Sequence, residues 1–269
     1  MKYPWFAAII SSISFSLAWA GTVGAGVVMA ETSTARGPDG QTNSQVKTIY
    51  VQGNKQKVER QDMASITDLD RSIIYIIDKQ HRAYAEVPLQ ALSPSLRANR
   101  PDESIKLDRT GKVRIIANHP CNEYRASKGD KLERITISAC VSASAPGAKE
   151  VSEFERKMIE RLRGHDSSER SSSPAAAALM LEKQSVVSFR MPDPSLHRAY
   201  RTASLLAETQ VKQIQLKALP ADTFKPPKGF NELRKGPHDG VPTASPHAVG
   251  NALEAVAPSP PNATQASNL

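Results

Sequence analysis

The stretch SIIYIIDKQHRAYAEVPL, residues 72–89, decides the fold class of this chain. Ile73 to Ile77 form an unbroken apolar run around one tyrosine, and the residues after the following turn alternate between polar and apolar. A strand with one face in water would alternate throughout, so a strand that is apolar on both faces must be covered on both. The stretch therefore predicts a β-hairpin that forms an interior wall, with another layer packed against it.

The hairpin ends a longer meander. From Val46 to Leu89 the chain consists of β-rich runs separated by short turn sequences such as Gly53-Asn54 and Asp70-Arg71. Connections this short force neighbouring strands to be antiparallel, because a parallel crossover needs about a dozen residues or more. More hairpin sequence follows at residues 104–142. The chain is therefore predicted to be an α+β protein built on an antiparallel sheet.

One segment has the pattern of a helix that covers such a sheet. In residues 147–164, GAKEVSEFERKMIERLRG, apolar side chains recur at steps of three and four residues: Val151, Phe154, Met158 and Leu162. Ser173-Pro174 followed by AAAALMLEK predicts a second, shorter helix. SVVSFRM at 185–191 indicates a strand, whereas periodicity leaves residues 203–219 open between strand and helix.

The two ends of the chain differ in composition from its middle. Residues 1–30 join one early cation to an apolar, small-residue run with Ala-x-Ala-like ends at Ala20 and Ala30, which predicts a signal peptide cleaved after Ala30. We expect a flexible segment at 31–45, one domain at 46–232 and a disordered Pro/Ala-rich tail at 233–269. The mature protein should be periplasmic or secreted and should not span the membrane, because glycines interrupt the apolar run.

Charge and motifs argue against several function classes. The net charge is +8, but opposite charges are interleaved and no basic run occurs, so nucleic-acid binding is not predicted. The histidines have no metal-binding spacing, and no nucleophile motif or phosphate loop appears. Asp68 and Asp70 could bind a cation or act as acid and base, but their positions are more typical of strand-end and turn residues. We therefore predict no catalytic residue, no metal, no cofactor and no enzymatic activity.

Cys121 and Cys140 are the only cysteines and lie in the two arms of one predicted hairpin. In an exported protein this predicts a disulfide. Bridged cysteines need Cα atoms within about 7 Å, so we expect directly opposed positions, with the turn centred between Asp130 and Lys131. Closing this loop should contribute on the order of 3 kcal/mol to stability.

Four segments in order resemble a bacterial family known only as domain of unknown function 4412: TIYVQGNKQKVE (48–59), ITDLDRSIIYIIDKQHRAYAEVPL (66–89), HPCNEYR (119–125) and LPADTFKPPKGF (219–230). That family is similar in turn to the periplasmic lipoprotein carriers of the LolA and LolB type. The resemblance implies a strongly curved antiparallel sheet, an unclosed barrel, with helices covering its concave face. It also implies that residues 203–219 form a strand. In such carriers the space between sheet and helices holds acyl chains.

Two functions from different classes follow. The first is a binding protein that holds a lipid or a lipoprotein acyl chain in a hydrophobic cavity between sheet and helices, an ordinary filled core being the alternative at this place. The residues expected to line the cavity are Ile74, Tyr75, Ile76, Ile77, Ile135, Ile137, Phe154 and Met158. The second is an envelope interaction or sensor protein that binds a protein partner through the edge of its open sheet.

Overall fold

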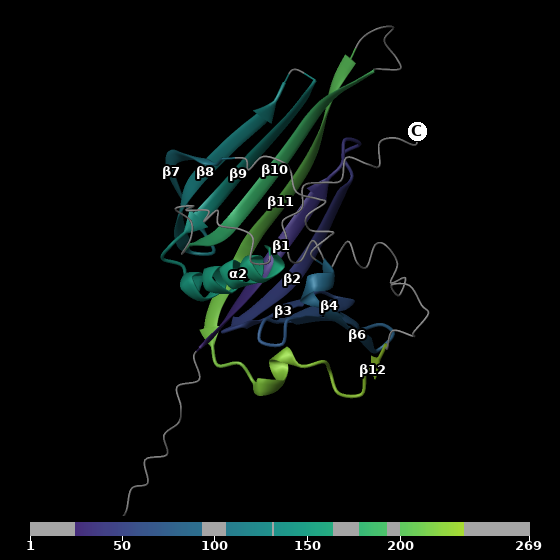
Figure 1. Ribbon diagram of the computed structural model, residues 1–269. Coiled ribbons are helices and arrows are strands. Elements are labelled where there is room, and N and C mark those ends of the chain that lie inside the picture. Colours follow the sequence, from purple (N-terminus) through teal and green to yellow (C-terminus); the bar gives the residue numbers. More distant parts are fainter. Residues whose placement is uncertain (1–24, 93–105, 131, 164–177, 193–199, 234–269) are drawn as a thin grey trace, which may run out of the picture.

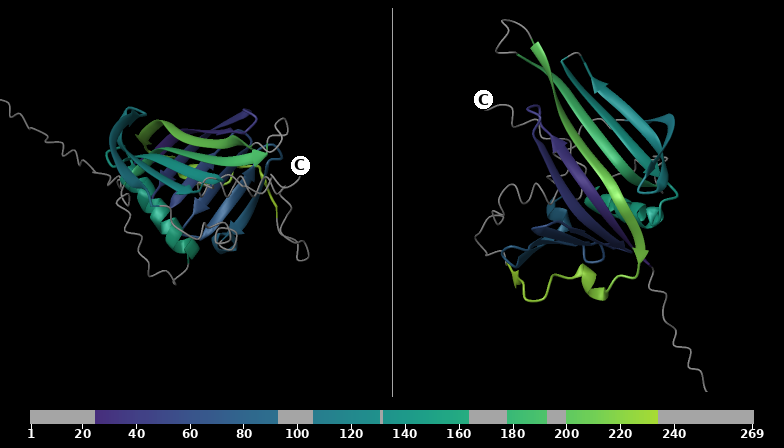
Figure 2. Two further views of the ribbon diagram at one scale, coloured as in Figure 1. Left: turned by 90° about the horizontal axis from the view of Figure 1, so that it is seen from above. Right: turned by 180° about the vertical axis from the view of Figure 1, so that it is seen from behind.

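The computed structural model describes residues 25–92, 106–130, 132–163, 178–192 and 200–233. Its framework is a 12-stranded sheet in the order β12-β6-β5-β4-β3-β2-β1-β11-β10-β9-β8-β7, antiparallel throughout except between β12 and β6. Figures 1 and 2 show that the sheet is strongly curved and does not close on itself, which confirms the predicted fold class. The elements are β1 (Gly26–Arg36), β2 (Thr42–Gln52), β3 (Lys55–Glu59), β4 (Met63–Asp68), β5 (Ile73–Asp78), β6 (Ala83–Pro88), β7 (Asp108–Ile116), β8 (His119–Gly129), β9 (Glu133–Ser142), α2 (Ala148–Arg163), β10 (Leu179–Pro192), β11 (Tyr200–Lys217), η1 (Ala221–Phe224) and β12 (Asn231–Glu232).

Strands β2 to β6 form the predicted meander. Gly53-Asn54 joins β2 to β3, and Gly53 has a φ of +58°, a left-handed conformation that glycine adopts at little cost. Ser72 and Arg82 also have positive φ and stand directly before β5 and β6. The short turns keep each strand beside its sequence neighbour, so the strand order of this part of the sheet could be predicted from local sequence.

Strand β1 differs from the prediction for the N-terminal part of the chain. It lies in the middle of the sheet and pairs with β2 on one side and β11 on the other. Residues 31–36 therefore belong to a strand and are not a flexible segment, and cleavage after Ala30 would cut that strand in two. The predicted leader up to residue 24 and the predicted tail from residue 234 lie outside the described residues.

The long strands β10 and β11 stand side by side above the meander (Figure 1). Strand β11 confirms that residues 203–217 are extended. The predicted short helix after Pro174 is wrong from Leu179 onwards, where β10 begins. Leu179 and Leu181 are both buried at strand spacing, and β9 and β11 supply backbone partners on the two sides. Tertiary pairing thus overrides the helical preference of the alanine-rich sequence.

Helix α2 confirms the predicted helix and lies against the concave side of the sheet (Figure 2). Phe154 and Met158 are buried in one cluster with strand residues such as Val27, which stabilises the packing through burial of apolar surface. The backbone N–H of Gly53 donates to Glu150 Oε1 at 2.6 Å and ties the start of the helix to the β2–β3 turn. Within the described ranges, no helix combines the length and the apolar character needed to cross a membrane.

A second apolar cluster lies on the opposite face of the sheet. Tyr75 and Ile77 pack with Leu219 and Phe224, which belong to the strap, as we call the segment between β11 and β12. The strap crosses beneath the meander to the β6 edge (Figure 1). Ile74 points to the other face and is also buried. The predicted two-sided burial of β5 is therefore confirmed, but the strap, and not the helix, covers Tyr75 and Ile77.

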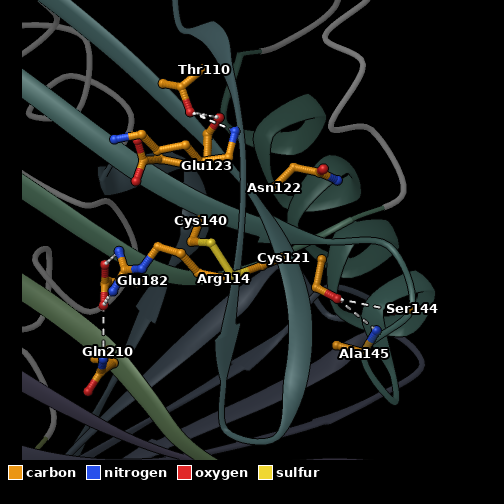
Figure 3. The surroundings of a disulfide bond; sticks show 12 residues. Thr110, Arg114, Cys121, Asn122, Glu123, Cys140, Ser144, Ala145, Glu182 and Gln210 are labelled. Atoms are coloured by element: carbon orange, nitrogen blue, oxygen red, sulfur yellow. Dashed lines mark hydrogen bonds and ion pairs between the residues drawn. A yellow bond between two sulfur atoms is a disulfide. The ribbon is translucent and has the colours of Figure 1, made fainter.

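Cys121 and Cys140 form the predicted disulfide, with their Cα atoms 5.4 Å apart (Figure 3). The predicted register is wrong, because Cys140 pairs with Glu123 and the bridge runs diagonally from β9 to β8. The Asp130 carboxylate accepts a hydrogen bond from the backbone N–H of Leu132 at 2.7 Å. This bond stabilises the turn, which is centred one residue further along the chain than we predicted.

A polar network beside the disulfide ties the sheet edge to its middle (Figure 3). The Arg114 guanidinium of β7 donates to both carboxylate oxygens of Glu182 on β10. Gln210 Nε2 on β11 donates to the same carboxylate at 2.8 Å. Hydrogen bonding to Glu182 raises the pKa of Arg114. Two-point Arg–carboxylate contacts are geometrically specific, so this network holds β7, β10 and β11 in a defined arrangement beside the bridge.

Candidate functional site

The structure divides the predicted cavity residues between two faces of the sheet. Phe154 and Met158 lie in the core between α2 and the sheet. Tyr75 and Ile77 face the strap on the opposite side. All four side chains are buried against protein, so the described residues form a filled core at both places.

The other predicted cavity residues point toward the concave side or lie on β9. Ile74 and Ile76 alternate with Tyr75 and therefore face the concave side, Ile74 buried and Ile76 half-buried. Ile135 and Ile137 are half-buried and belong to neither core cluster. A single cavity lined by all the predicted residues is therefore not what the chain forms.

Ile135 and Ile137 begin two rows of side chains that cross β9, β10 and β11. Direct cross-strand partners point to the same face of a sheet, so the register identifies each row. All members of these rows are half-buried, and none belongs to a core cluster. We call the two rows the trough: Ile135, Val187 and Leu205 in one, and Ile137, Ser185 and Ala207 in the other.

The trough lies on the same face of the sheet as α2. In the next row toward the helix, Lys183 pairs with Thr209, and Thr209 pairs with Ser33 of β1. Ser33 shares its face with Met29, which is buried in the core beneath α2. The trough therefore continues the concave wall beyond the helix, where β9 to β11 extend past it (Figure 1).

Charged residues border the trough on the side of the helix. Glu31 Oε1 and Lys47 Nζ form an ion pair at 2.6 Å, and both side chains are largely buried. Burial raises the pKa of Glu155 on α2, and the nearby Glu31 carboxylate raises it further. Burial lowers the pKa of Lys183. Glu155 itself is exposed. We call this group of charges at the helix end of the trough its charged floor.

A separate groove of about 520 Å³ lies at the start of α2 and is open to solvent. Val27, Gly147, Glu150 and Leu216 are among the residues that line it. Small apolar side chains alternate there with charged ones, and the groove does not reach the trough residues. It lacks the enclosed apolar lining that a buried small-molecule site has.

The carboxylates singled out in the sequence close a turn. Asp68 accepts hydrogen bonds from the backbone N–H groups of Asp70 at 3.0 Å and Arg71 at 3.1 Å, and pairs with Lys55 at 2.8 Å. Burial alone would raise the pKa of Asp68, but the hydrogen bonds from Lys55 and Arg71 lower it. A carboxylate committed to a turn in this way is a structural group. Among the described residues, no cluster of three or more His, Cys, Asp or Glu side chains could hold a metal ion.

Sequence reasoning missed the partners of Ile135 and Ile137 in the trough. Val187 lies in SVVSFRM, whose strand character was visible, and Leu205 lies in the segment whose period was ambiguous. Their shared face depends on the register between β9, β10 and β11. No local signal in the sequence carries that information.

Comparison with known proteins confirms the family resemblance. A family described as a domain of unknown function (DUF4412) matches residues 40–230. No curated protein matches the chain.

Several solved structures are similar to parts of the fold. A structure of PNGF-II has a TM-score of 0.33 at 10% identity, covering 79% of this chain and 31% of that one, so the chain spans about a third of that protein's length. An outer membrane lipoprotein-sorting protein domain from Vibrio parahaemolyticus has a TM-score of 0.29 at 6% identity, covering 74% of this chain and 89% of that one. A LolA superfamily protein from Nitrosomonas europaea has a TM-score of 0.28 at 8% identity, covering 76% of this chain and 90% of that one. Likenesses of this size do not assign a ligand to this chain.

Proposed function

The chain belongs to the family described as a domain of unknown function (DUF4412), and from this premise we propose that it is an exported, non-enzymatic protein that holds a lipid or lipoprotein acyl chain in the trough. The observation that carries the proposal is the pair of half-buried, largely apolar rows on the concave face. An apolar concave surface beside a few polar groups is the usual form of a small-molecule site.

The dimensions and the border of the trough suit a linear apolar group. Neighbouring strands lie about 4.8 Å apart, so three strands offer an apolar surface about 10 Å wide. On β10 and β11, Phe189 and Ala203 extend it by one more row away from the helix, in which the β9 member is Glu133. The row toward the helix is polar, with Lys183 and Thr209 beside Ser33. A ligand with an aliphatic tail against the rows and a polar end toward the charged floor would match both parts.

The packing beneath α2 favours a ligand site on the part of the sheet that extends beyond the helix. Phe154 and Met158 fill the space between helix and sheet, so an acyl chain there would have to displace packed core side chains. Such displacement costs the free energy of the burial that is lost. The trough, in contrast, offers apolar atoms that no described core residue covers. We therefore move the proposed ligand from beneath the helix to the wall beyond it.

Export is the second part of the proposal. The disulfide of Cys121 and Cys140 is of the kind that persists in oxidising compartments. The predicted leader at the N-terminus supports the same location. Both features agree with a periplasmic or secreted protein.

The test is the lipid content of natively purified protein. Val187→Glu and Ile137→Glu place a carboxylate in the trough, whereas Ser188→Glu and Thr136→Glu place one on the other face of the same strands. Lipid extraction followed by mass spectrometry should find bound lipid in the wild type and in the second pair, and should find it lost in the first pair. Lipid-free wild-type protein that takes up no fluorescent fatty acid would refute the proposal.

A specific observation at the sheet edge favours a second candidate function. β7 is the last strand at its end of the sheet, and its residues are exposed except for Ile116. Val113 and Ile115 are 63% and 76% exposed. Such an edge accepts an added strand from another protein.

Cross-linking in cells tests this candidate. A single dominant protein that cross-links to the wild type and is lost in Val113→Lys/Ile115→Lys would favour a partner-binding role. The matched control is Val46→Lys, which changes an exposed valine on β2, away from the edge. Loss of the partner in the control as well, or the absence of any dominant partner, would count against it.

A further inference from the structure

The β10–β11 hairpin projects beyond the rest of the sheet. The last residue of β1, Arg36, pairs with Leu206, so residues 200–205 of β11 have no β1 partner. On the other side, Glu133 of β9 pairs with Phe189 and marks the last β9 position in the ladder. Beyond these points β10 and β11 pair only with each other as strands, and the β8–β9 turn reaches this arm at Arg190. Figures 1 and 2 show the two-stranded arm extending past the ends of the other strands. An arm with so little packing of its own is positioned to meet something outside the molecule.

Two large apolar side chains lie exposed near the end of this arm. Tyr200 of β11 and Leu132, in the adjacent β8–β9 turn, are each 64% exposed. The two strand ends are joined, because the backbone N–H of Arg190 donates to the carbonyl oxygen of Leu132 at 2.9 Å. Exposed apolar groups at a protrusion are typical of an interaction site.

Exposed basic side chains occur on the same strand ends as these two apolar ones. The exposed cations of the tip, as we call this region with Leu132 and Tyr200, are Lys128, Arg134, Arg190 and Arg201. The described carboxylates among them are Asp130 and Glu133, so four positive charges face two negative ones. Hydrogen bonds from the backbone N–H groups of Glu133 and Leu132 lower the pKa of Asp130. The Asp130 carboxylate thus serves the turn, and the exposed cations of the tip outnumber its described carboxylates.

We propose that the tip docks on the surface of an anionic lipid bilayer. Tyr and Leu side chains enter the boundary between headgroups and acyl chains, while Arg and Lys keep their charged ends at the phosphates. A stable protein–protein interface buries about 800 Å² on each partner, which the end of a two-stranded arm does not offer as one surface. The combination of a narrow tip, two apolar side chains and flanking cations therefore fits a membrane surface better than an acidic protein.

The position of the tip gives this contact a direction. Along β10, Val187 of the trough is followed on the same face by Phe189, and Arg201 of the tip shares that face on β11, whereas Arg190 and Tyr200 point to the other face. A bilayer at the end of the arm would lie beyond the end of the trough that is opposite to its charged floor. The docking surface does not depend on what the trough holds and is tested separately.

The experiment is flotation of the full-length mature protein with vesicles. Vesicles of phosphatidylglycerol mixed into phosphatidylcholine are compared with vesicles of phosphatidylcholine alone. Each basic residue near an anionic surface contributes about fivefold to binding, so Arg190→Gln/Arg201→Gln should weaken partitioning by more than about tenfold. Leu132→Ser/Tyr200→Ser should also reduce it. The matched control, Lys112→Gln/Lys217→Gln, removes the same charge from exposed positions on other parts of the sheet.

A second measurement reports insertion directly and guards against misfolded variants. Tyr200→Trp places an indole at the tip, and its emission should shift to the blue with the anionic vesicles and not with the neutral ones. The tip positions are exposed, so the thermal unfolding midpoint should stay at the wild-type value.

Three results would each overturn the proposal. Wild-type protein that does not float with anionic vesicles is the first. An equal loss of binding in the control pair is the second, because it would assign the effect to net charge. Binding to soluble polyglutamate in the absence of vesicle binding is the third, because it would assign the tip to an acidic protein.

Discussion

Removal of residues up to Ala30 should prevent this chain from folding, and the mature protein should therefore begin before Gly26. The sequence offers two Ala-x-Ala-like ends, Ala20 and Ala30, and the residues between them decide the outcome. A chain that begins at Gly21 keeps all of β1, whereas a chain that begins at Glu31 lacks its first half.

The loss can be estimated from the core. Val27 is 0% exposed and Met29 is 3% exposed, and full burial of such side chains contributes about 1.5–3 kcal/mol each. The two together give about 3–6 kcal/mol, against about 5–15 kcal/mol for the whole stability of a domain. The pairing of Val27 through Ala30 with β2 on one side and β11 on the other is lost as well. Because β1 is a central strand, its removal also opens the ladder in the middle of the sheet.

The assay has two arms. Intact-mass measurement and N-terminal sequencing of the exported protein should place its first residue at or near Gly21. Urea unfolding should show a cooperative transition for the chain that begins at Gly21 and none, or one at much lower urea, for the chain that begins at Glu31. A stable exported protein that starts at Glu31, with the same unfolding midpoint as the longer chain, would refute the reasoning and would mean that β1 does not hold the sheet together.

Three further predictions concern stability. Cys121→Ala/Cys140→Ala should lower the free energy of unfolding by about 3 kcal/mol, because the bridge closes a loop with a sequence separation of 19, and a loss below about 1 kcal/mol in urea unfolding would contradict this. Phe154→Ala should cost about 3–5 kcal/mol by leaving a cavity beneath α2, and an unchanged urea midpoint would show that the helix is not a core element. Burial and the Glu31 carboxylate raise the pKa of Glu155, so the folded protein holds that proton more tightly than the unfolded chain does, and stability is lost as the pH rises through the raised pKa. Glu155→Gln should therefore melt at a higher temperature than the wild type at pH 7.5 and at the same temperature near pH 4, whereas a lower melting temperature at pH 7.5 would contradict the sign.

The parts of the fold that the sequence predicted are those with local causes. The β2–β6 meander follows from turns of a few residues, and α2 follows from apolar side chains at helical spacing. The disulfide of Cys121 and Cys140 follows from the predicted oxidising compartment and from the presence of only two cysteines in the sequence. Each of these signals lies within one segment of the chain, so no knowledge of distant contacts is needed.

The parts of the fold that we predicted wrongly depend on contacts between distant segments of the chain. β1 resembles the end of a leader because small residues are frequent in it, and the start of β10 resembles a helix because four alanines precede it in the sequence. Their strand conformation comes from partners far along the chain, such as Gly26 with Lys217. The register of the β8–β9 hairpin was missed because we assumed that bridged cysteines are directly opposed, whereas Cys140 pairs with Glu123.

The sequence by itself determined that Ile73 to Ile77 form a strand covered on both faces, that one amphipathic helix packs on the sheet, and that the cysteines join. Only the tertiary structure decided that the strap covers Tyr75, and that Ile137 joins Val187 in a trough beyond the helix. The physical reason is that the face of each strand side chain depends on register. A slip of one residue sends every side chain of a strand to the other face, and register across several strands is fixed by the packing of the whole sheet.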